Sequence, residues 1–141
     1  MKVYQISAVT LVVRKMEKSC SFYSQIPGFA LEYRGTPTDT FTSFRVGDTD
    51  GNMHLNLELK NRDNNEAPNS AKFGKQQDFG RVIFHTDDVD ALYSFFKDNS
   101  ALLQLVSFEN PPRDAPWGER FFHVRDPDGY QLSFAMPIKV A

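Results

Sequence analysis

The stretch RDPDGYQLSF, residues 125–134, is the strongest indication of the fold of this protein. Its Asp-Pro-Asp-Gly segment is typical of a tight turn, because proline presets one backbone dihedral and glycine tolerates a left-handed conformation. The run before the turn, ERFFHVR, and the run after it, YQLSFAM, are both rich in β-forming residues. We therefore predict a hairpin in which Leu132 and Phe134 enter the core while Ser133 lies on the opposite face.

A strand and a helix are predicted upstream of this hairpin. Val82 and Phe84 alternate with polar residues in RVIFHT, which indicates a strand. Asp87 or Asp88 is a natural N-cap for the helix that follows. Within DDVDALYSFFKDN the apolar residues recur at helical spacing, at Val89, Leu92, Tyr93 and Phe96.

The first half of the chain has the same order of elements. The strand SAVTLVV precedes a helix in SCSFYSQIPG, and FTSFRV then meets MHLNLEL across an acidic glycine turn. The pattern strand–helix–strands therefore occurs twice, with a period of about 75 residues. The polar segment 61–78 is the expected linker between the two halves.

Composition limits the class of protein. The chain has 141 residues, 40% of them hydrophobic and 13 of them Phe, which is enough for one domain with a real core. A net charge of −2 without a Lys/Arg cluster argues against a nucleic-acid surface. The single cysteine, Cys20, excludes an internal disulfide and is expected to be a core thiol in a reducing compartment. With no signal-peptide pattern or membrane-length segment, we expect a soluble cytoplasmic protein.

The duplicated pattern resembles the vicinal oxygen chelate superfamily, which includes glyoxalase I, bleomycin-resistance proteins, fosfomycin-resistance enzymes and extradiol dioxygenases. The resemblance rests on VTLVV, on FY near the end of the first helix with PGF after it, and on DPDG followed by a strand. It implies an α+β fold in which tandem βαβββ modules form curved mixed sheets around a concave cavity. Residues 1–141 would be one domain built from half-modules at about 1–60 and 79–141. The resemblance also implies a homodimer.

Metal-dependent members of this superfamily hold a divalent ion with side chains from four strands. Carried onto this sequence, the resemblance places Ala8 and Arg81 on the first strand of each half, and Glu58 and Ser133 on the last strand of each half. A register two residues away would replace Glu58 by Asn56. Alanine has no ligand atom, arginine repels a cation and a serine hydroxyl is a poor ligand. No cofactor is therefore expected, unless the ligands of a divalent metal are displaced to other residues.

Strand alternation assigns the side chains that face the cavity. His54, Asn56 and Glu58 share one face of their strand, opposite three leucines. Arg81, Ile83 and His85 share a face of theirs, and symmetric pairing of the hairpin would put Phe121 and His123 beside Ser133. We expect Arg81 and Glu58 to form an ion pair. That pair would either orient an anionic group of a ligand or be a structural salt bridge in a defunct site.

Histidines and aromatic residues supply the remaining candidates. His54, His85 and His123 are expected to line the cavity; two of them with Glu58 could form a displaced metal site. Alternatively, His123 or His85 could act as a general acid or base near Glu58. Trp117, in a proline-rich loop, could stack on a flat ligand or could cover the sheet edge or a dimer contact. Further aromatic lining could come from Phe41, Phe44 and Phe121.

Two classes of function follow from these residues. The first is metal-independent binding of a small organic molecule, drug-like or aromatic, with Arg81, Glu58, Asn56, His54, Trp117, Phe121, His123 and Ser133 as contacts. The second is an enzyme, a lyase, isomerase or dioxygenase, that uses displaced metal ligands or acid–base catalysis by Glu58, His123 or His85. An interaction module without a ligand fits the polar cavity face less well. In neither class is a nucleic acid or a membrane the expected partner.

Overall fold

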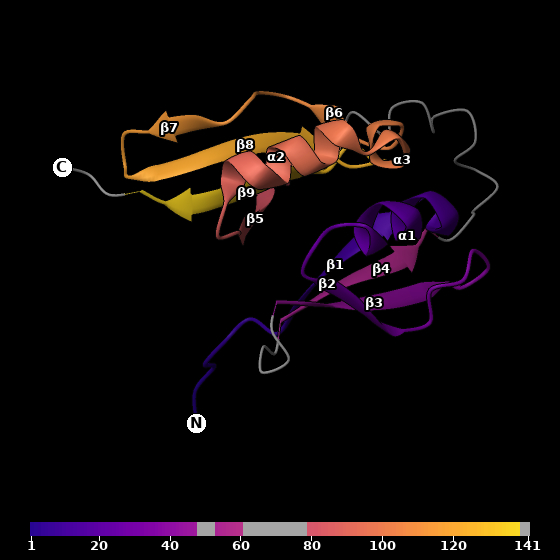
Figure 1. Ribbon diagram of the computed structural model, residues 1–141. Coiled ribbons are helices and arrows are strands. Elements are labelled where there is room, and N and C mark those ends of the chain that lie inside the picture. The colour runs from indigo at the N-terminus through magenta and orange to yellow at the C-terminus, as the bar shows by residue number, and fades with distance from the viewer. Residues whose placement is uncertain (48–52, 61–78, 139–141) are drawn as a thin grey trace. The chain divides into compact units, whose positions relative to one another are not determined.

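Figure 1 shows the computed structural model, which describes residues 1–47, 53–60 and 79–138. Backbone contacts divide the chain into two units, Met1–Asn64 and Asn65–Ala141, and each is described by itself. The predicted linker 61–78 lies outside the described residues, as does most of the predicted first-half turn. Among the described residues, no helix is both long enough and apolar enough to cross a membrane.

The N-terminal unit is a mixed four-stranded sheet with one helix. The strand order is β1-β4-β3-β2. The β1–β4 pair is parallel and the other two pairs are antiparallel. Its elements are β1 (Ala8–Val13), α1 (Met16–Ser24), β2 (Phe29–Tyr33), β3 (Phe41–Val46) and β4 (His54–Leu59).

Alternation along β4 separates the core from the opposite face, as predicted. Leu55 and Leu57 are buried, whereas Glu58 between Leu57 and Leu59 is exposed. The helix α1 begins at Met16, three residues before the predicted start, and its Tyr23 ring lies 6.3 Å from that of Phe44 on β3. Phe44 is fully buried on this helix side. Its predicted place in the cavity lining is therefore wrong, because even-numbered residues of β3 face the core.

The C-terminal unit repeats this plan with extra elements. Its sheet has the order β5-β9-β8-β6, and β7 also pairs with β8 (Figure 1). Again the first strand of the unit, β5, runs parallel to the last, β9, and the hairpin β8–β9 is antiparallel. The elements are β5 (Arg81–His85), α2 (Val89–Asp98), α3 (Ser100–Leu103), β6 (Ser107–Phe108), β7 (Arg113–Ala115), β8 (Glu119–Arg125) and β9 (Gln131–Pro137).

Helix α2 packs an apolar stripe onto this sheet. Asp88 caps the helix, since its side chain accepts a hydrogen bond of 2.9 Å from the Ala91 amide. The ring of Phe96 lies 6.0 Å from that of Phe122 and 5.5 Å from that of Phe134. Phe122 and Phe134 therefore mark the helix side of β8 and β9, and the odd-numbered residues of β8 and β9 face the other way.

The register of the hairpin confirms symmetric pairing about its turn. His123 pairs with Ser133, and Phe121 pairs with Ala135. Asp126 accepts hydrogen bonds of 2.9 Å from the amides of Asp128 and Tyr130, which closes the Asp-Pro-Asp-Gly turn. The α+β fold with two strand–helix–strands modules, predicted from the sequence, is confirmed.

Candidate ligand-binding site

The face of the C-terminal sheet opposite α2 carries most of the predicted site residues. We call it the helix-free face. It consists of Arg81, Ile83 and His85 on β5, Gln131, Ser133 and Ala135 on β9, and Glu119, Phe121, His123 and Arg125 on β8.

Three aromatic side chains form a row along β8 on this face. The Trp117 indole stacks on Phe121 with ring centroids 6.2 Å apart and planes inclined by 20°. The Phe121 ring in turn lies 4.9 Å from the imidazole of His123. Phe121 is 7% exposed but Trp117 is 71% exposed, so the indole covers the phenyl ring and leaves much of its own surface to solvent. An exposed indole supported from beneath is a ready platform for a flat molecule.

A tight hairpin positions this indole. Ala115 pairs with Glu119, so the β7–β8 connection contains only Pro116, Trp117 and Gly118. Gly118 has a φ of 95°, the left-handed conformation that three-residue hairpin loops require. The Trp117 Nε1–H donates to Glu119 Oε1 at 3.0 Å, which fixes the ring. The proline-rich loop predicted from the sequence is thus partly strand, because residues 113–115 form β7.

Glu119 also holds one of the predicted histidines. The second carboxylate oxygen of Glu119 lies 3.1 Å from Nε2 of His85. His85 therefore has its carboxylate partner within its own unit. The predicted pairing of His85 with Glu58 involves two different units and stays a prediction.

A network of hydrogen-bonded polar side chains lies at the end of the helix-free face away from Trp117. Arg81 Nε donates to Gln131 Oε1 at 2.7 Å, and Gln131 Nε2 donates to Glu109 Oε1 at 2.6 Å. Arg125 Nε donates to the other carboxylate oxygen of Glu109 at 2.8 Å. Burial raises the pKa of Glu109, but these hydrogen bonds from Gln131 and Arg125 outweigh it and lower the pKa. The predicted ion pair of Arg81 with Glu58 also spans the two units and stays a prediction.

His123 lies among positive charges. Burial is the main cause that lowers the pKa of His123, and the positive charge of Arg81 adds to it. Arg113 on β7 acts in the same direction. A lowered pKa means that the imidazole is neutral at pH 7, where it can both donate and accept a hydrogen bond. Ser133, its partner across the sheet, is buried at 4% exposure, so neighbouring side chains cover the serine hydroxyl.

The face of the N-terminal sheet that points away from α1 carries His54, Asn56 and Glu58. The Asn56 side chain accepts from Ser43 Oγ at 2.7 Å and donates to Thr10 Oγ1 at 3.2 Å. His54 Nε2 lies 2.9 Å from Glu32 Oε1, and Arg45 binds the other oxygen of Glu32. The hydrogen bond from His54, together with Arg45, holds the pKa of Glu32 below its usual range. No partner for the exposed Glu58 side chain occurs among the described residues.

The two units repeat this carboxylate arrangement. In one, Glu32 binds Arg45 and His54; in the other, Glu109 binds Arg125 and Gln131. The strand registers agree, because Arg45 pairs with His54 as Arg125 pairs with Gln131. Two residues further along these strands, Asn56 is the counterpart of Ser133, and four residues further along, Glu58 is the counterpart of Ala135.

The donor chemistry at the four metal positions that the superfamily resemblance implies follows from this correspondence. With Asn56 as the counterpart of Ser133, those positions hold Ala8, Asn56, Arg81 and Ser133. This set has no carboxylate, imidazole or thiolate, and it includes a permanent cation, so it does not fit a divalent metal ion. Among residues 1–47, 53–60 and 79–138, no cluster of three or more His, Cys, Asp or Glu side chains could hold one elsewhere.

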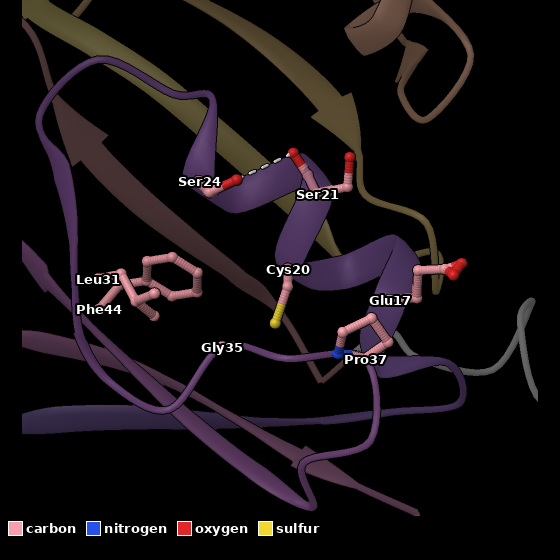
Figure 2. A pocket seen from close by; sticks show the side chains of 8 residues that line it. All are labelled: Glu17, Cys20, Ser21, Ser24, Leu31, Gly35, Pro37 and Phe44. Atoms are coloured by element: carbon pink, nitrogen blue, oxygen red, sulfur yellow. Dashed lines mark hydrogen bonds between the residues drawn. The ribbon is translucent and has the colours of Figure 1, made fainter.

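A separate pocket lies on the helix side of the N-terminal unit (Figure 2). One face of α1 provides Glu17, Cys20, Ser21 and Ser24, while Leu31 and Phe44 come from the sheet. Gly35 and Pro37 belong to the β2–β3 loop that closes the other side. The Asp39 carboxylate holds that loop by accepting from the amides of Gly35 at 2.8 Å and Thr36 at 2.7 Å. No pattern in the sequence predicts this pocket.

Cys20 in this pocket is expected to react slowly with thiol reagents. Burial raises the pKa of the Cys20 thiol, and the nearby Asp39 adds to that rise, while a 3.6 Å hydrogen bond to Thr42 opposes both. Because the thiolate is the reactive form, labelling by dithiobis(nitrobenzoate) at pH 7.5 should be at least about tenfold slower in the native protein than in urea. Cys20 is the single cysteine, so Cys20→Ser gives the blank. Equal rates in native and unfolded protein would contradict this.

Comparison with known proteins identifies the family to which the sequence is similar. The sequence matches the family model described as the Glyoxalase/Bleomycin resistance protein/Dioxygenase superfamily over residues 5–134. A search of curated protein sequences finds no significant match.

Several solved structures have a similar fold. A glyoxalase-related enzyme from Fulvimarina pelagi has a TM-score of 0.67 and 18% identity, with 94% of this chain and 88% of that chain covered. A possible glyoxalase from Bacillus cereus has a TM-score of 0.64 and 20% identity, with 95% and 100% covered. A superfamily member from Sphaerobacter thermophilus has a TM-score of 0.58 and 22% identity, with 94% and 97% covered. Likeness at these identities shows the fold alone.

Proposed function

The chain belongs to the glyoxalase/bleomycin resistance protein/dioxygenase superfamily, and on that premise we propose that it binds a small, flat organic molecule on the helix-free face without a metal ion. The observation that carries this proposal is the row of Trp117, Phe121 and His123, in which the outermost indole is 71% exposed yet fixed by Glu119. A large aromatic side chain held rigid in solvent loses little conformational entropy when a ligand stacks on it.

The donor set supports a metal-independent mode of binding. Ala8, Asn56, Arg81 and Ser133 do not fit a divalent ion, so no step of this proposal passes through one. In this proposal the protein is a cytoplasmic homodimer. The proposal of a dimer rests on the frequent dimerisation of superfamily members. The proposal of a reducing compartment rests on the single cysteine.

One observation favours an enzyme as the second candidate. His123 is half-buried and its pKa is lowered, so a neutral imidazole faces any molecule on the platform and can accept a proton from it. That activity would be acid–base chemistry of the lyase or isomerase kind. It would require that His123→Gln abolish turnover while binding of the substrate persists.

Removal of the indole should weaken ligand binding. We expect Trp117→Ala to raise the Kd of planar aromatic ligands about tenfold, since it removes one stacking surface, and Trp117→Phe to raise it less. Isothermal titration with a panel of aromatic amides, led by 2-naphthamide, measures this. Phe95→Ala is the matched control, because Phe95 is a 39% exposed aromatic residue on α2.

The same titration tests the role of metal. Dialysis against EDTA should leave the Kd unchanged. Binding that disappears with EDTA and returns with Zn²⁺ would overturn the metal-independent proposal. An equal loss of affinity in Trp117→Ala and Phe95→Ala would overturn the assignment of the platform.

A further inference from the structure

The pocket between α1 and the β2–β3 loop of the N-terminal unit takes no part in the proposed function (Figure 2). From its shape and its charge we infer that it is a second ligand site, which binds a small organic amine with the apolar part inside and the ammonium group at Glu17. This inference goes beyond the proposed function, because Trp117 and its platform belong to the C-terminal unit.

The pocket exists because α1 leaves part of the sheet uncovered. Leu31 on β2 pairs with the fully buried Phe44 on β3, so both side chains point to the helix side. Leu31 is nevertheless 50% exposed. Three of the four α1 residues that line the pocket are small, namely Cys20, Ser21 and Ser24. A half-exposed leucine on the core side of a sheet is apolar surface that a ligand can bury.

The loop on the other side of the pocket is held in place, so the pocket is formed before a ligand arrives. The Asp39 carboxylate fixes the loop through the amides of Gly35 and Thr36. Gly35 has a φ of 119°, which favours glycine, and a Cβ at this position would lie 2.5 Å from Leu31 Cδ2. The volume is about 310 Å³, near the lower limit for small-molecule sites, so the ligand is small.

Glu17 gives the pocket its preference for a cation. Among the described residues that line the pocket, it has the one side chain that is ionised at pH 7. Its carboxylate has no ion pair or hydrogen bond within the described part of the chain. Lys18 follows it in α1 but does not line the pocket, since adjacent residues of a helix do not face the same way. Asp39 is paired with Arg34 at 3.8 Å, which leaves Glu17 as the unbalanced charge.

The lining residues are arranged along the pocket in an order that suits an amine with an apolar body. Glu17 and Ser24 are seven positions apart on one face of α1, which is about 10 Å along the helix. In Figure 2, Leu31 and Phe44 lie on one side of Cys20 and Glu17 lies on the other. An elongated ligand along α1 therefore places its apolar part on the leucine and its ammonium group at the carboxylate.

Cys20 reports occupation of the pocket, because it is the single cysteine and its sulfur points into the space between α1 and the loop (Figure 2). The probes are 2-phenylethylamine, a cation at pH 7.5, the neutral 2-phenylethanol and the anionic 3-phenylpropanoate. Protection of Cys20 from iodoacetamide, followed by mass spectrometry, gives the Kd of each. We expect the Kd of the amine to be at least about tenfold lower than that of the alcohol, with the acid weakest. Equal protection by all three probes, or protection by none, would overturn the inference.

Two charge variants test the role of Glu17. Glu17→Gln should remove most of the preference for the amine and leave the affinity for the alcohol unchanged. Glu32→Gln removes the same charge from the other face of the sheet, where Glu32 binds Arg45 and His54, and should leave the preference intact. A preference that survives in Glu17→Gln, or that is lost equally in both variants, would overturn the assignment of the ammonium group to Glu17.

Two leucine variants test the pocket itself. Ser21→Leu fills the pocket with a good helix former and should abolish binding of the amine, measured by isothermal titration because the leucine also shields Cys20. Lys18→Leu puts the same side chain on α1 outside the pocket and should leave binding intact. Undiminished binding in Ser21→Leu would overturn the site. Titration with 2-naphthamide reports the platform separately, so failure of the amine to bind does not count against the proposed function.

Discussion

Replacing Phe134 by alanine is expected to lower the free energy of unfolding by about 4 kcal/mol. Phe134 is 2% exposed, and its ring lies 5.4 Å from those of Phe84 and Phe122 and 5.5 Å from that of Phe96. These contacts join α2 to three strands of the C-terminal sheet, so truncation leaves a cavity that rigid neighbours cannot fill. Urea unfolding followed by circular dichroism measures the change in free energy.

Two variants calibrate this result. Phe134→Leu keeps most of the apolar volume and should cost about 1.5 kcal/mol. Phe95→Ala truncates an aromatic residue of α2 that is 39% exposed, and its cost should be well below that of Phe134→Ala. If Phe134→Ala and Phe95→Ala lowered stability equally, Phe134 would not have the central place in the core that the ring contacts give it.

The fold was predictable because its signals are local. Asp-Pro-Asp-Gly specifies a turn by backbone preference alone, and a turn fixes which residues of its two arms pair. The predicted pairing of His123 with Ser133 followed from that turn without any tertiary information. Helix α2 was equally local, with an Asp88 cap and an apolar stripe at helical spacing.

Side-chain partners were less predictable because they depend on distant strands. The predicted ion pair of Arg81 with Glu58 spans the two units and stays a prediction, whereas the contact of Arg81 with Gln131, 50 positions along the chain, was not predicted. Gln131 occupies that place because β5 runs parallel to β9 with Arg81 opposite Gln131. A sequence pattern shows which face a residue occupies. It does not show which residue of another strand lies beside it.

The same limit explains why parts of the site were missed. Glu119, Glu109 and Arg113 were not among the predicted site residues, yet the first two anchor Trp117 and Gln131, and the third lies over Phe121. Arg113 reaches that ring only because residues 113–115 form a strand beside β8. A three-residue strand in a proline-rich segment gives almost no periodic signal.

The Asp-Pro-Asp-Gly turn depends on the buried side chain of Asp126. Asp126→Ala should lower the free energy of unfolding by about 3 kcal/mol, because it removes the acceptor for two backbone amides inside a buried turn. Asp126 is 4% exposed, and one of its oxygens accepts from the amides of Asp128 and Tyr130 at 2.9 Å each. Thermal unfolding of the variant should begin well below that of the wild-type protein.

Asp126→Asn separates the hydrogen bonds from other causes of instability. The asparagine carbonyl can accept both amide hydrogens in nearly the same place, so this variant should lose only about 1 kcal/mol. A loss in Asp126→Asn as large as that in Asp126→Ala would mean that the negative charge, and not the acceptor geometry, stabilises the turn. No loss in Asp126→Ala would mean that the pairing of β8 with β9 fixes the hairpin unaided, through contacts such as Phe122 with Phe134.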